Sequence, residues 1–294
     1  MPECPVCGRD EFFRCFSSGQ FARTGFYSDQ KKNCADKSPI IVQACGHCGF
    51  MRLQDTTTPD VDYTDVNRDT TRQLPEYTSD LLDLFSQFFG GKDASILEVG
   101  ANNGTFMNEM VKAGYSNLSG IEPSTYLAGV ATDRGLKVFN AYFDMDFARC
   151  RVADGQAVSG IICRHTLEHV PDCRLMMQSI HTLLCDNGIA FIEVPDTGYL
   201  LDKTFCHEIW DEHINYFTLT TLQELAEQVG FEVLRAEAWP FRETSNLIMF
   251  VRKKQFRAHT RPHKGKDLVK IRGLQSAWDA LTASWRAEME GARG

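Results

Sequence analysis

The chain has 294 residues, 43% of them hydrophobic, and a formal net charge of −8. A chain of this length can bury one large core and a small additional domain. The negative charge disfavours nucleic acid as the main partner, because phosphate binding favours a basic face. No apolar stretch approaches the roughly 20 residues of a membrane span, and the first residues do not resemble a signal peptide, so we expect a cytoplasmic protein.

Four cysteines form two Cys-x-x-Cys-Gly motifs, at residues 4–8 and 45–49. Each pair can supply two thiolates to one Zn²⁺, and the glycine after it leaves backbone N–H groups free to bond the sulfur atoms. Two such motifs favour a closed, structural zinc site over a redox-active dithiol. We therefore predict a small zinc-ribbon-like domain, residues 1–53, in which the metal ligands are Cys4, Cys7, Cys45 and Cys48.

A polar stretch and an apolar stretch follow the cysteine motifs. Residues 54–62 contain three threonines and a proline, as expected for a linker. Residues 76–89 carry leucine and aromatic side chains at helical spacing, which indicates a helix packed in a core. We assign residues 54–90 to this linker and helix.

Residues 94–123 contain the most informative motif. The short apolar run 95–99 is typical of a buried parallel strand and carries Glu98 near its end. Gly100 and Gly104 then open a turn into a helix, where glycine lets the backbone pass close to a ligand. The next apolar run ends on Glu122, which is well placed to accept both hydroxyls of a ribose. The segment predicts a strand–helix–strand unit that binds a nucleoside.

The composition of the loop separates two nucleoside cofactors. A dinucleotide site needs Gly-x-Gly-x-x-Gly to hold a pyrophosphate, whereas Asn102 and Thr105 replace two of these glycines. This disfavours a nicotinamide-dependent oxidoreductase. The loop resembles motif I of class I S-adenosylmethionine (SAM) methyltransferases, acidic-x-Gly-x-Gly-x-Gly. The resemblance implies that SAM is held at its methionine end by Glu98, Gly100, Asn102 and Gly104, and at its ribose by Glu122.

The following segments alternate between helix and strand. Helices are expected at 125–134, 173–184 and 222–228, and strands at 136–140, 157–163, 189–194, 231–236 and 246–252. This order predicts an α/β fold with a Rossmann-like, seven-stranded doubly wound methyltransferase sheet over residues 91–255. The resemblance implies that Phe143 and Asp144 contact the adenine and that His165 lies in the turn over the cofactor. The remaining cysteines in apolar or helical contexts are expected to be buried thiols: Cys150, Cys163, Cys173, Cys185 and Cys206.

Two segments with histidines could carry chemistry. His165–His169 follows a strand at the rim where open α/β sheets bind ligands. The segment Trp210–Phe217 lies in a polar insertion and contains the pair Glu212 and His213. Histidine titrates near neutral pH, so this pair is a candidate acid–base group. A segment that only packs its aromatic side chains is equally consistent with the sequence.

The cysteine motifs, the glycine loop and the Glu-His-x-x-Tyr-Phe segment together resemble the zinc-containing C-methyltransferases of deoxysugar biosynthesis, over about residues 1–255. Those enzymes methylate nucleotide-linked keto-sugars and use a histidine base to form an enolate. The resemblance implies that His213 is the base and that Glu212 and His169 support it. Trp210 replaces the family's usual tyrosine. An O-methyltransferase of a polysaccharide or natural-product precursor, or of another small hydroxylated metabolite, therefore stays open, as does a non-catalytic zinc- and SAM-binding partner subunit.

The C-terminal residues 256–294 combine a basic linker with an amphipathic helix. Apolar side chains recur there at spacings of three and four: Ile271, Leu274, Trp278, Leu281, Trp285 and Met289. Two tryptophans on one stripe need a partner surface. That surface is either the rest of this chain or a second subunit in a homodimer.

Overall fold

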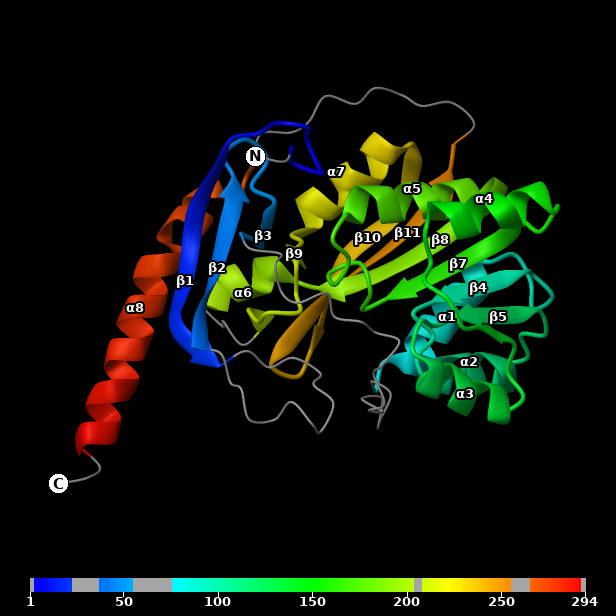
Figure 1. The fold of residues 1–294 in the computed structure, drawn as a ribbon, viewed down its shortest axis with the longest axis horizontal. Helices are drawn as coiled ribbons and strands as arrows, with labels where there is room; N and C mark the ends of the chain where they lie inside the picture. The colour runs from blue at the N-terminus through cyan, green and yellow to red at the C-terminus, as the bar shows by residue number, and fades with distance from the viewer. Residues whose placement is uncertain (1–2, 23–36, 55–75, 204–207, 255–264, 292–294) are drawn as a thin grey trace.

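The computed structural model describes residues 3–22, 37–54, 76–203, 208–254 and 265–291. These residues form two β-sheets flanked by helices (Figure 1). The larger sheet has the strand order β10-β11-β8-β7-β4-β5-β6. Its strands are β4 (Ile96–Val99), β5 (Leu118–Ile121), β6 (Val138–Phe139), β7 (Val158–Arg164), β8 (Leu184–Pro195), β10 (Phe231–Phe241) and β11 (Thr244–Lys253).

The pairing of these strands confirms the predicted doubly wound, seven-stranded sheet. β4 runs parallel to β5 and β7, β5 runs parallel to β6, and β7 runs parallel to β8. β11 is antiparallel to both β8 and β10. The chain moves outward from β4 to β6 and then returns to β7 on the other side of β4. The carboxyl ends of β4 and β7 therefore form the switch point at which open α/β sheets bind ligands.

Helices cover both faces of this sheet. One face carries α1 (Thr78–Phe88) and α2 (Thr105–Lys112), with α3 (Thr125–Asp133) beside β6, and the other carries α4 (Met145–Ala153), α5 (Cys173–Leu183) and α7 (Leu219–Val229) (Figure 1). Successive strand residues pack in opposite directions. Ile162 joins Phe85 of α1 in one buried cluster, whereas Ile161 joins Met177 of α5 in another. Such two-sided burial explains why the strands read as continuous apolar runs.

Several element boundaries differ from the sequence prediction. β8 begins at Leu184, and β10 and β11 continue to a tight turn at Arg242, which has a left-handed φ of 53°. Helices α4 and α6 (Thr197–Lys203) were not predicted. α4 has no apolar stripe to reveal it, because the buried residue of this helix is Ala148 alone. Its start is set instead by Asp144, whose carboxylate accepts a hydrogen bond from the Phe147 N–H at 2.8 Å.

The expected buried thiols are only partly confirmed. Cys163 and Cys173 are buried and Cys185 is half-buried, but the prediction for Cys150 was wrong, since this thiol is exposed on α4. It lies two residues from Ala148, and two residues rotate by about 200° around a helix, which places the thiol on the outer face. Cys206 lies outside the described residues, as does most of the predicted linker at 54–62.

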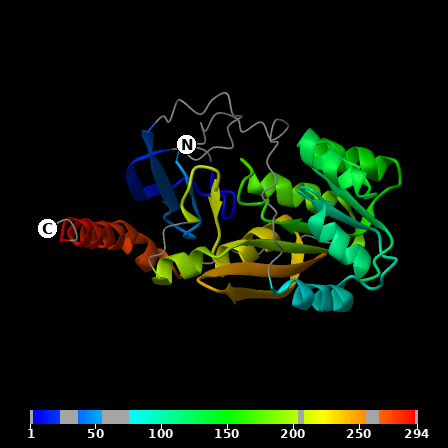
Figure 2. The ribbon, with the colours of Figure 1, turned by 90° about the horizontal axis from the view of Figure 1, so that it is seen from below.

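The second sheet joins the cysteine-rich region to the larger sheet. Its strands pair in the order β1 (Phe12–Ala22), β2 (Lys37–Cys45), β3 (Met51–Leu53) and β9 (Asn215–Tyr216). β9 comes from the insertion that follows β8 and runs antiparallel to β3, beside the blue N-terminal strands in Figure 2. The Leu53 N–H extends the pairing by donating to the Ile214 carbonyl at 2.9 Å. The smaller sheet therefore includes residues on both sides of the predicted boundary at residue 53.

Side chains also connect the cysteine motifs to the rest of the chain. The guanidinium of Arg174 on α5 donates to the carbonyls of Pro5 and Val6 in the first cysteine motif, the latter at 2.9 Å. The buried rings of Phe50 and Phe217 lie 5.5 Å apart between centroids. The first cysteine motif therefore packs against α5. Phe50, which follows the second motif, packs against Phe217, which follows β9.

The C-terminal helix α8 (Leu268–Gly291) lies along β1 (Figure 1). Ile271 and Leu274 are buried in the core of the smaller sheet, and the Trp278 ring contacts Phe16 with centroids 5.4 Å apart. The chain's own N-terminal sheet is therefore the partner of this part of the apolar stripe. The side chains of Trp285 and Met289 lie outside the described ones. In the described ranges, no helix combines the length and the apolar character needed to cross a membrane.

Candidate active site

The carboxyl ends of the parallel strands bring the predicted cofactor residues to one rim. Glu98 lies in β4, Glu122 follows β5, Phe143 follows β6 and His165 follows β7. Parallel strands that are neighbours in a sheet end at the same edge, so residues up to 67 positions apart in the chain meet there. The rim is the geometric basis of the candidate site.

The glycine loop after β4 has a left-handed backbone at three positions. The φ angles are 72° at Gly100, 50° at Asn102 and 76° at Gly104. A Cβ at Gly100 would overlap Oγ1 of Thr166, and one at Gly104 would overlap the side chain of Leu136. These two glycines are therefore required by the backbone conformation and by packing against the protein itself, whereas the sequence suggested close approach to a ligand.

Glu122 holds this loop in place. Its Oε2 accepts the Asn102 N–H and its Oε1 accepts the Ser124 N–H, both at 2.9 Å. Burial raises the pKa of the carboxyl, while the two backbone N–H groups act in the opposite direction. A carboxylate oxygen has more than one acceptor site, so each oxygen can still accept a hydroxyl proton. The geometry suits a vicinal diol.

Glu98 is a buried acid close to the same loop. Its side chain is only 5% exposed, and among the described residues its Oε2 has no hydrogen-bond partner. Burial raises its pKa to about 8, in spite of the nearby Arg164 guanidinium, and the Glu122 carboxyl adds to the rise. A buried carboxyl without a donor is costly unless a ligand supplies one. An ammonium group is the ligand that would compensate Glu98 best.

Phe143 and Asp144, which lie between β6 and α4, differ in their surroundings. Phe143 is buried, and its ring lies 5.9 Å from that of Phe147. Asp144 is the N-cap of α4 described above, a structural role that the resemblance did not suggest. The segment that leads from β6 to these residues is tied to the end of β5, because the Asn140 side chain donates to the Glu122 carbonyl at 3.0 Å.

A buried polar network under the rim was not found from the sequence. Nε of Arg164 bonds to Glu193 Oε2 at 2.5 Å, and the Tyr77 hydroxyl donates to Glu193 Oε1 at 2.6 Å. Asn246 donates to the same Oε1 at 3.0 Å. Burial alone would raise the pKa of Glu193, but Arg164 and His165 hold it far below its usual range. The sequence signal that could have revealed this network is a charged residue within an apolar strand, as Glu193 is in β8, or at its end, as Arg164 is in β7.

The turn after β7 gathers two histidines around Glu168. His165, with a left-handed φ of 46°, has Nδ1 3.5 Å from Glu168 Oε1 and Nε2 3.5 Å from Glu193 Oε1. The His165 side chain is 42% exposed, and its partial burial lowers its pKa, but the two carboxylates outweigh this effect and raise the pKa to about 10. His169 Nε2 lies 3.8 Å from Glu168 Oε1. The two carboxylates therefore favour the cationic form of His165.

The segment around His213 is fastened to this turn. Nδ1 of His169 bonds to the Glu212 carbonyl at 2.8 Å, and the Ile214 N–H donates to the Glu168 carbonyl at the same distance. The rings of His169 and His213 are 5.0 Å apart between centroids. The two histidine segments, more than 40 residues apart in the sequence, thus form one cluster, which we call the histidine cluster: His165, Glu168, His169 and His213.

His213 itself is almost enclosed. Its side chain is 8% exposed, and its Nδ1 bonds to the Glu208 carbonyl at 3.0 Å. The Trp210 ring lies 4.9 Å away between centroids. Burial lowers the pKa of His213 to about 4, although the Glu168 carboxylate acts to raise it. The imidazole is therefore neutral at pH 7, and an Nδ1–H bonded to a carbonyl leaves Nε2 as a proton acceptor.

One ligand atom each from Glu168, His169 and His213 lies within 4.8 Å of the others, a spacing that also suits a metal ion. The His165 ring brings a positive charge to within 3.5 Å of the same carboxylate. That charge disfavours a divalent cation at this position. The histidine cluster is better suited to proton chemistry.

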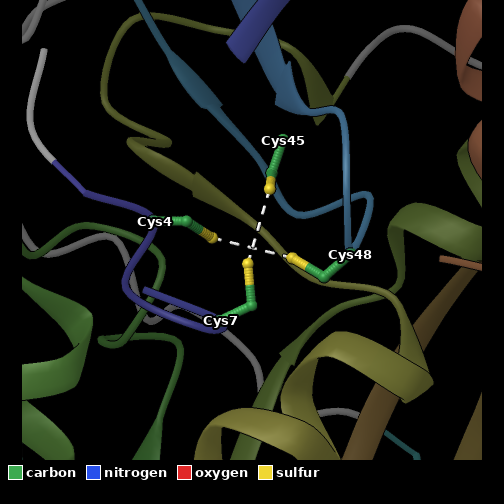
Figure 3. A group of neighbouring side chains, drawn as sticks. All are labelled: Cys4, Cys7, Cys45 and Cys48. Atoms are coloured by element: carbon green, nitrogen blue, oxygen red, sulfur yellow. Dashed lines mark hydrogen bonds between the residues drawn. The ribbon is translucent and has the colours of Figure 1, made fainter. Parts of the chain in front are cut away.

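The four predicted metal ligands converge on one point (Figure 3). Cys4 and Cys48 have their sulfur atoms 3.6 Å apart, and so do Cys7 and Cys45. This is far longer than a disulfide bond and close to the edge of about 3.8 Å expected for a tetrahedron with Zn–S bonds of about 2.3 Å. Four thiols in this arrangement fit one closed metal site.

Comparison with known proteins gives consistent matches. A family model described as "Methyltransferase domain" matches residues 70–236, more than half of the chain. The C-methyltransferase NovU of Streptomyces niveus is 29% identical over 241 residues, which cover 80% of this chain and 57% of NovU. The chain thus spans a little over half the length of that relative.

Solved structures of methyltransferases are also similar. A SAM-dependent methyltransferase from Anabaena variabilis has a TM-score of 0.49 at 15% identity, covering 60% of this chain and 83% of its own. The 1,6-didemethyltoxoflavin-N1-methyltransferase of Burkholderia thailandensis has a TM-score of 0.46 at 17% identity, covering 61% and 79%. The family match and the strand order together give the assignment: the chain belongs to the methyltransferase domain family, with the Rossmann-like sheet of class I SAM-dependent methyltransferases.

Proposed function

We propose that this chain transfers a methyl group from SAM to a nucleotide-linked sugar, with His213 as the general base. The observation that carries the proposal is the docking of the His213 segment on the turn after β7, at the rim that also carries Glu98 and Glu122. The C-methyltransferase relative supports transfer to carbon. The sugar substrate is supported by the resemblance of the cysteine motifs, the glycine loop and the Glu-His pair to the deoxysugar enzymes.

The rim residues fit SAM as a bound cofactor, which would supply an electrophilic methyl group. Glu98 is buried and its Oε2 has no donor among the described residues, so it matches the methionine ammonium, and Glu122 matches the ribose diol. The full set that we assign to the cofactor is Glu98, Gly100, Asn102, Gly104, Glu122, Phe143, Asp144 and His165. Zn²⁺ is the metal we assign to the four cysteines, where a site without an open position has a structural role.

Replacing Glu122 with alanine should weaken SAH (S-adenosylhomocysteine) binding. The change removes a charged acceptor from the ribose and also leaves two backbone N–H groups without their acceptor, that of Asn102 in the glycine loop and that of Ser124 after β5. Hydrogen bonds to charged groups contribute about 1.5–3 kcal/mol, or about 10- to 150-fold in affinity. Isothermal titration with SAH measures this. Glu109→Ala, a change at a half-buried residue of α2, is the control, and equal affinities in the two variants would contradict the role of Glu122.

The chain's own groups can handle the proton that the acceptor loses. His213 is neutral at pH 7, and the carbonyl of Glu208 fixes the orientation of its ring. His169 is held in the same way by the Glu212 carbonyl, and we assign both His169 and Glu212 a supporting role. A ring nitrogen of His213 takes the proton from the carbon next to a ketone, so the electron pair that remains makes this carbon the nucleophile.

The proposal is tested with SAM and a panel of nucleotide-diphosphate sugars, with and without a keto group. SAH release measures turnover, and NMR of the product locates the new methyl group. We expect turnover of a keto-sugar with methylation at the carbon next to the ketone. Methylation on oxygen would favour the O-methyltransferase alternative. SAH binding without any turnover would favour the non-catalytic partner subunit.

A further inference from the structure

Glu168 occupies the centre of the histidine cluster. Its side chain is 2% exposed, and its Oε1 faces His165 Nδ1 at 3.5 Å and His169 Nε2 at 3.8 Å. A ring nitrogen of His213 lies within 4.8 Å of both the Glu168 and the His169 ligand atoms. One buried carboxylate is thus close to three imidazoles that come from two segments of the chain.

The backbone of Glu168 fixes this arrangement. Its carbonyl accepts the N–H groups of Ile214 and Asn215, at 2.8 and 2.9 Å. The Asn215 side chain donates to the carbonyls of Leu167 and Val170, on either side of the same turn. The distance between the Glu168 carboxylate and the His213 ring is therefore set by main-chain bonds, and a substitution at the Glu168 side chain leaves those bonds in place.

The charges around His213 show which group can compensate a proton on its ring. Three residues of the turn after β7 act on the His213 ring. Glu168 favours its protonated form, whereas His169 and His165 disfavour that form. From its own segment His213 faces the Glu208 carboxylate, 3.8 Å from Nδ1 and partly exposed. Burial of the ring also opposes the charge. Glu168 is the buried anion on the side where His169 and His213 meet.

We propose that Glu168 is a positioning residue whose carboxylate keeps His165 cationic and stabilises the charge that His213 acquires with a proton. The inference rests on the proposed function of His213. The proton passes from the acceptor to a ring nitrogen of His213, the electron pair stays on the acceptor, and Glu168 remains ionised throughout. The positive charge of His165 balances Glu168 before the transfer, so the carboxylate does not take the proton itself.

The test is Glu168→Gln, which removes the charge and nearly keeps the shape. The first measurement is an NMR titration of histidine rings in the SAH-bound full chain, with His165 assigned from the spectrum of His165→Asn. We expect the pKa of His165 to fall by about 1 to 3 pH units, the usual effect of one neighbouring opposite charge. The second is turnover of the sugar panel, where kcat should fall about 10- to 100-fold with KM and SAH affinity unchanged. Glu168→Asp should recover part of kcat.

The matched control is Glu224→Gln, another buried glutamate, on α7 and outside the histidine cluster. It should leave the His165 titration as in the wild type. An unchanged His165 pKa in Glu168→Gln, or an unchanged kcat, overturns the inference. The two hypotheses fail separately. A wild-type chain that turns over none of the panel removes the proposed substrate, while the His165 titration still decides whether Glu168 controls the charge of the cluster.

Discussion

Replacing His213 with alanine is expected to lower kcat by about 10²- to 10⁴-fold, the usual contribution of a positioned general base, with SAH affinity unchanged. The neutral ring is held between the Glu208 carbonyl and the Trp210 ring, and we assign it to the proton of the acceptor, whereas other residues bind the cofactor. Steady-state kinetics on the sugar that the wild type methylates, together with SAH titration, measure both quantities.

His213→Asn separates the chemical role from a structural one. Its amide can still donate to the Glu208 carbonyl but cannot take a proton. We expect it to be as inactive as the alanine variant. Turnover like that of the wild type in His213→Asn would mean that the ring serves packing, and His169 would become the next candidate base. Glu98→Ala should show the reverse pattern, with weaker SAH binding as its main effect.

The pH dependence follows from the direction of the pKa change. The pKa of folded His213 is about 4, below the 6.5 of an unfolded histidine. Between these values the unfolded chain binds more protons, so the contribution of this residue to stability is present above about 6.5 and is lost as the pH falls toward 4. Activity depends on the neutral ring, so kcat should fall as the pH approaches 4.

Replacing both Cys4 and Cys7 with serine should abolish metal binding and unfold the N-terminal sheet. Purified wild-type chain should contain one equivalent of zinc, and the variant none. The free energy of binding a structural zinc, about 10–16 kcal/mol in small zinc peptides, is also folding free energy. Because β3 pairs with β9, the loss should extend to the segment that carries His213. Metal analysis and hydrogen exchange at Met51–Leu53 and Asn215–Tyr216 measure these effects.

The control for the zinc prediction is Cys150→Ser, an exposed thiol on α4. It should keep the full zinc content and the protection of both strands. SAH binding should survive in the double variant, since the rim residues belong to the larger sheet. A metal-free chain in which β3 and β9 remain protected would show that the four cysteines are not needed for the fold.

The sequence alone determined the features that depend on short-range patterns. The two cysteine motifs, the glycine loop and the acid at the end of the next strand each lie within a few residues, so spacing identifies them. The alternation of apolar runs with helical stripes predicted an α/β fold with a doubly wound sheet, because burial on both faces of a parallel sheet leaves that pattern in the chain. His165, His169 and His213 could be named as candidates because the segments that contain them follow predicted strands.

Only the tertiary structure decided how these parts act on one another. β9 has two residues, too few for any periodicity, and its partner β3 lies more than 160 positions earlier in the chain. The bonds of Glu193 to Tyr77, Arg164 and Asn246 likewise join four separate segments. A side chain at Gly100 or Gly104 would also overlap Thr166 or Leu136, which lie outside the loop sequence. Buried polar groups must find partners wherever the fold brings them, and such pairings leave no local pattern in the sequence.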